Sequence, residues 1–234
     1  MAPVARELSS VGGVLEPLQT ADSIEGQIKE LGNILERSGD LPLSLIGFSW
    51  GAMLAFIFAA RFPDSVKKLI LLSSGAFEEK YSERIMDTRL NRLTGGERIE
   101  LNALIDILND PASPDKDSVL ARLGRLMSKT DAYRPVPGGD ENLEVRYSIY
   151  QSVWREAQDL RRSGRLLDLG REIRCPVVAI HGDHDPHPPD GVNIPLSGVL
   201  RDFRFILLKK CGHRAWLEQE AREFFLRILK NELI

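Results

Sequence analysis

The feature that most constrains this chain is a Gly-x-Ser-x-Gly motif, Gly47–Gly51, between a short apolar run and a helical pattern. Leu43–Ile46 is typical of a buried strand, and Ala52–Arg61, rich in Ala, Leu, Ile and Phe, is typical of a helix. A turn this tight leaves no room for bulky side chains two residues before and after the serine, and it exposes the serine at the strand tip. The motif therefore predicts a reactive position at Ser49, with an ordinary helix N-cap serine as the alternative interpretation.

The order of apolar segments indicates a parallel sheet with helices on both faces. The segments typical of strands are Gly13–Leu18, Leu43–Ile46, Lys68–Ser73, Cys175–Gly182 and Asp202–Leu208. Helical patterns lie between them. The first of these has apolar residues at helical spacing from 24 to 35, and Asp22 opens it with Glu25 three residues on, in the manner of a capping box. Strands that alternate with helices are the pattern of an α/β fold.

Residues 76–173 interrupt this alternation. Polar helical segments are predicted at Glu97–Leu108, Ser118–Ser128 and Leu143–Ser163, separated by Pro and Gly breaks, and no convincing strand occurs among them. We therefore predict an α/β core made of residues 1–75 and 174–234, with an all-helical cap, or lid, inserted at 76–173.

Composition excludes several classes of protein. The net charge of −3 comes without a basic run, so nucleic acid is not an expected partner. No apolar stretch approaches the roughly 18 residues of a membrane span, so no membrane partner is expected either. The two cysteines, Cys175 and Cys211, would lie at opposite edges of the sheet and cannot form a disulfide, which fits a reducing, cytoplasmic location.

Three predicted strands are followed by reactive residue types: Ser49, the segment His181–Asp185, and the segment Lys209–His213. In parallel α/β sheets, functional sites gather beyond the carboxyl ends of the strands. A serine hydroxyl needs a base within hydrogen-bond reach, and the base needs a carboxylate to fix its tautomer. The order serine, carboxylate, histidine is the order of catalytic triads on this sheet type, with either Asp183 or Asp185 as the carboxylate.

A metal site is the alternative interpretation of the histidines. His181, His184 and His187 lie three residues apart with aspartates between them, which resembles a ligand set. Spacing by three aligns ligands on a helix, but the prolines at 186, 188 and 189 exclude a helix here. We therefore expect no metal and no cofactor.

Together, Gly47–Gly51, His181–Pro186 and Cys211–His213 resemble the nucleophile, acid and histidine segments of the α/β-hydrolase fold superfamily. The tryptophan after Ser49 and the helical insertion before the acid segment are most similar to its proline-iminopeptidase-like branch. The resemblance runs from about Val14 to the C-terminus. It implies a serine hydrolase that cleaves a small ester or amide, or a short peptide at its N-terminal residue, through an acyl-enzyme.

The resemblance also implies a role for individual residues. Ser49 would be the nucleophile, His213 the general base, and Asp185, placed a few residues beyond the strand-ending glycine, the orienting acid in preference to Asp183. The backbone N–H of Trp50 would be one oxyanion donor.

Two residues in the longest predicted helix of the insertion are candidate substrate contacts, Trp154 and Glu156. In iminopeptidase-like caps, acidic residues hold the free amino group of the substrate, so the resemblance makes Glu156 a candidate for that role. A solvated helix face is the alternative interpretation of Glu156.

A second oxyanion donor normally comes from a His-Gly-rich loop after an earlier strand, and this sequence has no such segment. The chain thus resembles a truncated α/β-hydrolase fold. We expect Val14–Leu18 to pair directly with Leu43–Ile46, which gives a parallel sheet of about five strands. A second subunit is one way to cover the exposed edge of this sheet, so a homodimer is a candidate assembly. A weakly active or non-catalytic binding protein is the alternative to an enzyme, because half of the oxyanion hole is missing from the sequence.

Overall fold

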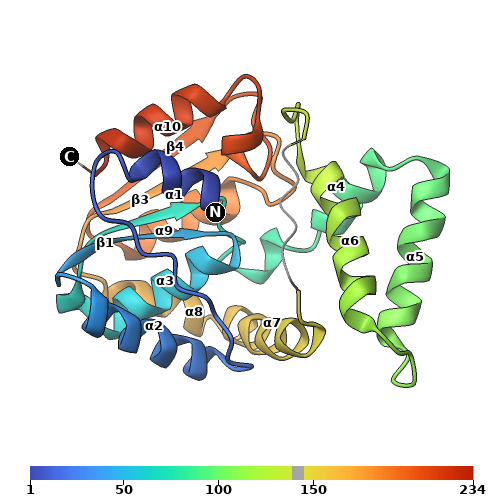
Figure 1. Ribbon diagram of the computed structural model, residues 1–234, viewed down its shortest axis with the longest axis horizontal. Coiled ribbons are helices and arrows are strands. Elements are labelled where there is room, and N and C mark those ends of the chain that lie inside the picture. The colour runs from blue at the N-terminus through green and yellow to red at the C-terminus, as the bar shows by residue number, and fades with distance from the viewer. Residues whose placement is uncertain (139–144, 234) are drawn as a thin grey trace.

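The computed structural model describes residues 1–138 and 145–233, and its core is a parallel sheet of four strands in the order β1-β2-β3-β4 (Figure 1). The strands are β1 (Leu43–Phe48), β2 (Val66–Leu72), β3 (Val177–Gly182) and β4 (Phe203–Leu208). Because all of the strands are parallel, their carboxyl ends lie at one edge of the sheet.

Ten α-helices occur in the described residues. They are α1 (Ala2–Leu8), α2 (Ile24–Ser38), α3 (Trp50–Arg61), α4 (Ile85–Arg92), α5 (Gly95–Asn109), α6 (Lys116–Asp131), α7 (Tyr147–Arg162), α8 (Arg165–Asp168), α9 (Asp190–Val199) and α10 (Arg222–Asn231).

The two inner strands carry continuous apolar runs, Leu69–Leu72 in β2 and Val177–Ile180 in β3, because both faces of the sheet are buried there. In β2, Leu69 and Leu71 pack into one hydrophobic cluster, with α2, α3 and α9, while Ile70 and Leu72 pack into the other, with α1 and α10. Strand side chains alternate between faces, so each strand supplies both clusters. Helix α3 is buried at every position from Ala52 to Ala60, which explains why it is apolar on all sides rather than along one stripe.

The predicted first strand is wrong. Val14–Leu18 forms no strand, and Val14, Leu15 and Leu18 are 40%, 44% and 79% exposed. Pro17 offers no backbone N–H for a strand ladder. Instead the segment leads into α2, where Glu30 accepts hydrogen bonds from the backbone of Thr20 and Ala21. Strand β1 is therefore the edge of the sheet, which has four strands in the described residues rather than about five.

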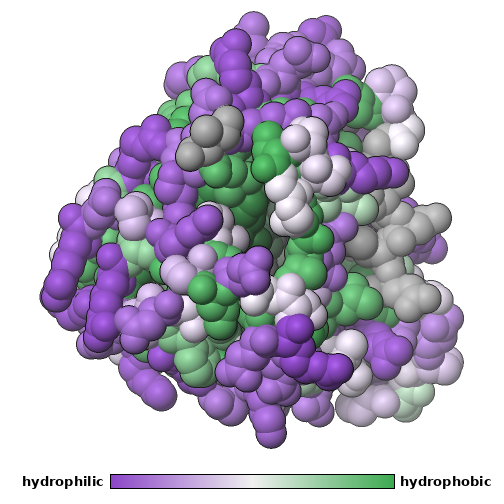
Figure 2. Space-filling view, turned by 60° about the vertical axis from the view of Figure 1, so that its left-hand side comes forward, coloured by the Kyte–Doolittle hydropathy of each residue, from purple (hydrophilic) through white to green (hydrophobic). Residues whose placement is uncertain are grey.

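On the face of the molecule shown in Figure 2, hydrophobic side chains gather around a hollow, and hydrophilic side chains cover most of the remaining surface of that face. The connection between α1 and α2 also exposes apolar side chains, those of Val11, Val14, Leu15 and Leu18. Among the described residues no helix is both long and apolar enough to span a membrane.

The helices α4 to α8 lie between β2 and β3 in the chain, and no strand occurs within residues 76–138 and 145–173. Helices α4, α5 and α6 share a small hydrophobic cluster that includes Leu93, Leu101 and Leu126, and they stand beyond the carboxyl ends of the strands (Figure 1). The predicted helix Leu143–Ser163 corresponds to α7, while 143 and 144 lie outside the described residues. The division into a core and a cap at 76 and 173 stays a prediction.

Candidate active site

The turn between β1 and α3 holds Ser49 in a backbone conformation that L-residues rarely adopt, φ 53° and ψ −118°. The N–H of Ser49 donates to the carbonyl of Leu72 at 2.9 Å, which ties the turn to the end of β2. A Cβ at Gly47 would lie 2.2 Å from the carbonyl oxygen of Gly51 and 2.6 Å from Cα of Ala52. Glycine is therefore required at 47. At Gly51 a Cβ would meet nothing within 4 Å, so the expectation that both glycines are sterically required holds only for the first.

The Ser49 side chain makes no capping hydrogen bond to α3, although the residue occupies the N-cap position. Its hydroxyl lies 3.0 Å from Nε2 of His213 instead. The helix N-cap interpretation of this serine therefore lacks the hydrogen bond that defines a cap.

The carboxylate of Asp185 follows β3 and lies 2.7 Å from Nδ1 of His213. Its side chain has no exposed surface. Burial raises the pKa of Asp185, but the nearby His213 and the hydrogen bonds from His187 and His213 outweigh burial and hold the pKa well below its usual value. An ionised carboxylate only accepts, so Nδ1 of His213 carries the hydrogen and Nε2 is left to accept the hydrogen of the Ser49 hydroxyl.

Asp183, the alternative acid, does not face His213. Its carboxylate accepts the N–H of Cys211 at 3.3 Å, and it lies 3.7 Å from the ammonium of Lys209. Asp183 therefore supports the turn between two loops. Both cysteines are free thiols, as the sequence predicted.

The loop that carries His213 is fixed by residues that the sequence did not reveal. The N–H of His213 donates to the carbonyl of Asp131, at the end of α6, at 2.8 Å. The buried carboxylate of Glu218 accepts the N–H of Gly212 at 2.9 Å, and also those of Tyr133 and Arg134. A Cβ at Gly212 would lie 2.2 Å from the Asp131 carbonyl, so the two segments touch at their backbones. The contacts of Glu218 with Tyr133 and Arg134 join residues 85 and 84 positions apart in the chain, and no local sequence pattern marks them.

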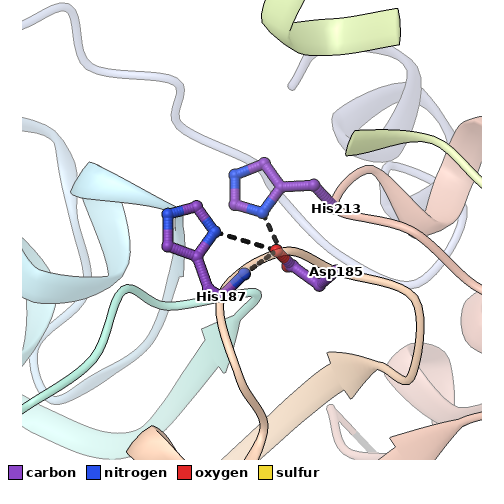
Figure 3. Close-up of side chains that lie close together, drawn as sticks. All are labelled: Asp185, His187 and His213. Atoms are coloured by element: carbon purple, nitrogen blue, oxygen red, sulfur yellow. Dashed lines mark hydrogen bonds and ion pairs between the residues drawn. The ribbon is translucent and has the colours of Figure 1, made fainter. Parts of the chain in front are cut away.

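The three histidines of the proposed metal alternative do not converge as one ligand set. His181 is 1% exposed and its Nε2–H donates to the carbonyl of His187 at 2.8 Å, while the ring of His184 packs edge-on against Tyr133. A different trio, Asp185, His187 and His213, brings its ligand atoms within 4.8 Å of one another. Figure 3 shows both rings turned to the same carboxylate. Their Nδ1 atoms donate hydrogens there, so these atoms offer no lone pair to a metal.

A cavity of about 630 Å³ opens at Ser49 and His213. This volume lies in the usual range for a small-molecule site. Its opposite wall comes from α4, α6 and α7 and is largely apolar, with Met86, Leu123 and Val153 among its residues.

Trp154 lines this cavity, with its ring stacked parallel to that of Tyr150 at 6.1 Å between the ring centres, and its role as a substrate contact stays a prediction. Glu156 is not among the lining residues. Its carboxylate accepts the N–H of Ile24 at 2.8 Å, where the first turn of α2 has unpaired donors. Glu156 thus caps a core helix instead of facing the cavity in which a substrate would bind.

Trp50 is the first residue of α3, a position whose backbone N–H has no acceptor within the helix. The indole N–H of Trp50 donates to the Gln27 side chain at 2.9 Å. This hydrogen bond fixes the residue that follows Ser49, whose backbone N–H is the expected oxyanion donor.

Comparison with known proteins agrees with this fold. Residues 20–219 match the family described as alpha/beta hydrolase fold. The chain belongs to this family. The superfamily that the sequence motifs resembled is thereby confirmed.

Relatives within the alpha/beta hydrolase fold family differ in activity. The chain is 24% identical to a 2-hydroxy-6-oxo-2,4-heptadienoate hydrolase of Pseudomonas putida, over 98% of this chain and 77% of the relative. It is also 24% identical to a pimeloyl-[acyl-carrier protein] methyl ester esterase of Neisseria meningitidis, over 76% of this chain and 53% of the relative.

Among solved structures, a proline iminopeptidase of Mycobacterium smegmatis has a TM-score of 0.57 at 20% identity, over 95% of this chain and 76% of that chain. At this identity the likeness shows the fold alone. The iminopeptidase is one neighbour among hydrolases and esterases, so the family is established and the branch is not.

Proposed function

We propose that this alpha/beta hydrolase fold protein is a serine hydrolase that cleaves a small ester or amide through an acyl-enzyme. The observation that carries the proposal is the chain of hydrogen bonds from Ser49 through His213 to Asp185, at 3.0 and 2.7 Å, at the floor of the cavity. The names of relatives as hydrolases and esterases support the same class of reaction.

In the proposed reaction, Oγ of Ser49 attacks the substrate carbonyl carbon while Nε2 of His213 takes the hydroxyl proton. The ionised Asp185 stabilises the imidazolium that forms, because it is buried and accepts the Nδ1–H of His213. The backbone N–H of Trp50 donates to the developing oxyanion. The imidazolium then returns its proton from Nε2 to the leaving oxygen or nitrogen, and the bond to the acyl carbon breaks. Water repeats the cycle on the acyl-enzyme, releases the acid and restores Ser49.

We propose that the helices at 76–173 act as the cap over this reaction. The wall of the cavity opposite Ser49 comes from α4, α6 and α7, which fits that role. A peptide substrate with a free amino group would need an unpaired acid in the wall. Two acids line the cavity: Glu79 is ion-paired with Arg161 at 2.7 Å, whereas Glu83 is exposed and forms no ion pair within the described residues. Glu156 lies elsewhere. Glu83 is therefore the acid that a substrate amino group would meet, and the wall does not separate such peptides from other ester and amide substrates.

Covalent labelling by a fluorophosphonate probe tests the proposal. The wild-type protein should form a Ser49 adduct, identified by peptide mass spectrometry, and Ser49→Ala should form none. Ser82→Ala is the matched control, because Ser82 lines the same cavity but its hydroxyl donates to the Glu79 carbonyl. Folded wild-type protein that forms no adduct at Ser49 at pH 8 would favour a non-catalytic binding protein instead.

A further inference from the structure

Asp185 binds a second imidazole besides that of His213. Its Oδ2 faces His213, whereas its Oδ1 accepts both the backbone N–H of His187 at 2.9 Å and Nδ1–H of the same residue at 2.8 Å. The rings of His187 and His213 are 4.9 Å apart between their centres and tilted by 32°. A triad needs only one of these imidazoles, so the role of His187 is open.

The hydrogen bonds fix the tautomer of His187. An ionised carboxylate cannot donate, so Nδ1 of His187 carries a hydrogen. Burial lowers the pKa of His187, and the hydrogen bond and charge of Asp185 only partly offset it, so the ring is neutral at pH 7. A neutral imidazole with hydrogen on Nδ1 has a bare lone pair on Nε2. His187 therefore offers a hydrogen-bond acceptor on the side of the ring that faces away from Asp185.

That side of the ring meets the cavity. His187 and His213 both line it, and 11% of the His187 side chain remains exposed. Figure 3 shows both rings bound to the Asp185 carboxylate through one nitrogen, with the other ring nitrogen, Nε2, of each histidine pointing away from Asp185 to the same side. When His213 protonates a leaving group, the leaving atom must lie within hydrogen-bond reach of its Nε2. The acceptor on His187 thus lies beside the leaving group rather than beside the apolar wall of α4, α6 and α7.

We infer that His187 is a specificity-determining residue, whose Nε2 accepts a hydrogen bond from a hydroxyl one or two carbons from the leaving oxygen. The preferred substrates are then esters of hydroxylated alcohols rather than of simple alkyl alcohols. This inference rests on the proposed serine hydrolase activity. An ester with such a hydroxyl should have a higher kcat/KM than the same ester without it, by the contribution of one neutral hydrogen bond, about 2- to 12-fold.

A pair of nearly isosteric esters tests this inference in the wild-type protein. 2-Hydroxyethyl butanoate and propyl butanoate differ by a hydroxyl in place of a methyl group at the end of the leaving alcohol. We expect a higher kcat/KM for the hydroxyethyl ester by the factor above. Turnover of both esters at equal kcat/KM overturns the inference and leaves the serine hydrolase in place. Absence of turnover together with absence of Ser49 labelling overturns both.

Two substitutions separate the functions of the ring. In His187→Asn the amide can replace the donor to Asp185, but nothing replaces Nε2, so the preference for the hydroxyethyl ester should fall to about 1. In His187→Gln the amide oxygen can reach the position of Nε2, so part of the preference should return. His184→Asn is the matched control from the same loop, since His184 does not line the cavity, and it should keep the wild-type ratio. A full preference in His187→Asn would show that the hydroxyl is recognised elsewhere and would overturn the inference.

Discussion

The substitution Asp185→Asn tests how the proposed triad depends on the tautomer of His213. An asparagine amide has one acceptor oxygen and one donor NH₂ group where Asp185 has two acceptors. His187 presents two hydrogens to Oδ1, at 2.9 and 2.8 Å, and one of them is a backbone N–H that cannot change its role. The amide oxygen should therefore stay at the Oδ1 position, and the NH₂ group should replace Oδ2, 2.7 Å from Nδ1 of His213.

In that arrangement His213 must present a bare Nδ1 to the new NH₂ group. Its hydrogen then sits on Nε2, which can donate to Ser49 but cannot take the proton of its hydroxyl. Loss of the base in a triad through the wrong tautomer lowers kcat by about 10,000-fold, equivalent to roughly 5 kcal/mol in the activation free energy. We expect a loss of this size for Asp185→Asn.

The assay is hydrolysis of 4-nitrophenyl butanoate, followed by absorbance at pH 8, with thermal melting to show that each variant is folded. Asp183→Asn is the matched control, because Asp183 lies two residues away but contacts Cys211 and Lys209 instead of His213, and its kcat should stay within about threefold of wild type. A folded Asp185→Asn variant that keeps more than a tenth of the wild-type kcat would refute the reasoning about the tautomer.

Two further predictions concern stability. Gly47→Ala places a Cβ 2.2 Å from the Gly51 carbonyl oxygen and should lower the free energy of unfolding by about 3 kcal/mol. Gly51→Ala adds its Cβ in open space and should change this free energy by no more than about 1 kcal/mol. Equal effects of the two substitutions in urea denaturation would contradict this account of the turn. Burial lowers the pKa of His181 in the folded protein, whereas in the unfolded chain this pKa is about 6.5. At a pH between these two values the unfolded chain binds a proton at His181 that the folded protein does not. Stability should therefore fall as pH is lowered through about 6.5, by up to roughly 1.4 kcal/mol per pH unit from this residue, and His181→Gln, which keeps a donor near Nε2, should lose less between pH 7.5 and 5.5. An equal loss in wild type and His181→Gln would show that His181 does not contribute.

The apolar runs predicted all four observed strands, and the clearest runs lie in the two inner strands. β2 and β3 are apolar at consecutive positions because alternate residues enter different hydrophobic clusters, and this leaves a continuous apolar run. Val14–Leu18 has a similar composition but no neighbouring strand, and sequence alone does not reveal whether a partner is present. Helix α4 was not predicted, since it is short, none of its residues is buried and its apolar residues are interrupted by charged ones.

Site residues divide in the same way. Ser49, Asp185 and His213 could be predicted because each follows a strand and the ends of parallel strands meet at one edge. Glu156 could not be assigned, since its partner is a backbone N–H 132 residues away, and a carboxylate that caps a distant helix looks the same in sequence as one that binds a substrate. His187 appeared in the sequence only as a member of a metal-like spacing. Its hydrogen bond to Asp185 depends on a loop that no periodicity describes.

The helices between β2 and β3 contribute to the site through the backbone as well as through the wall of the cavity. The carbonyl of Asp131 accepts the N–H of His213, and the Asp131 carboxylate accepts hydrogen bonds from the guanidinium of Arg89, which itself lines the cavity. The backbone position of His213, and with it the Ser49–His213 hydrogen bond, therefore depends on a contact with a residue of 76–173, although this segment resembles an independent addition to the core in the sequence.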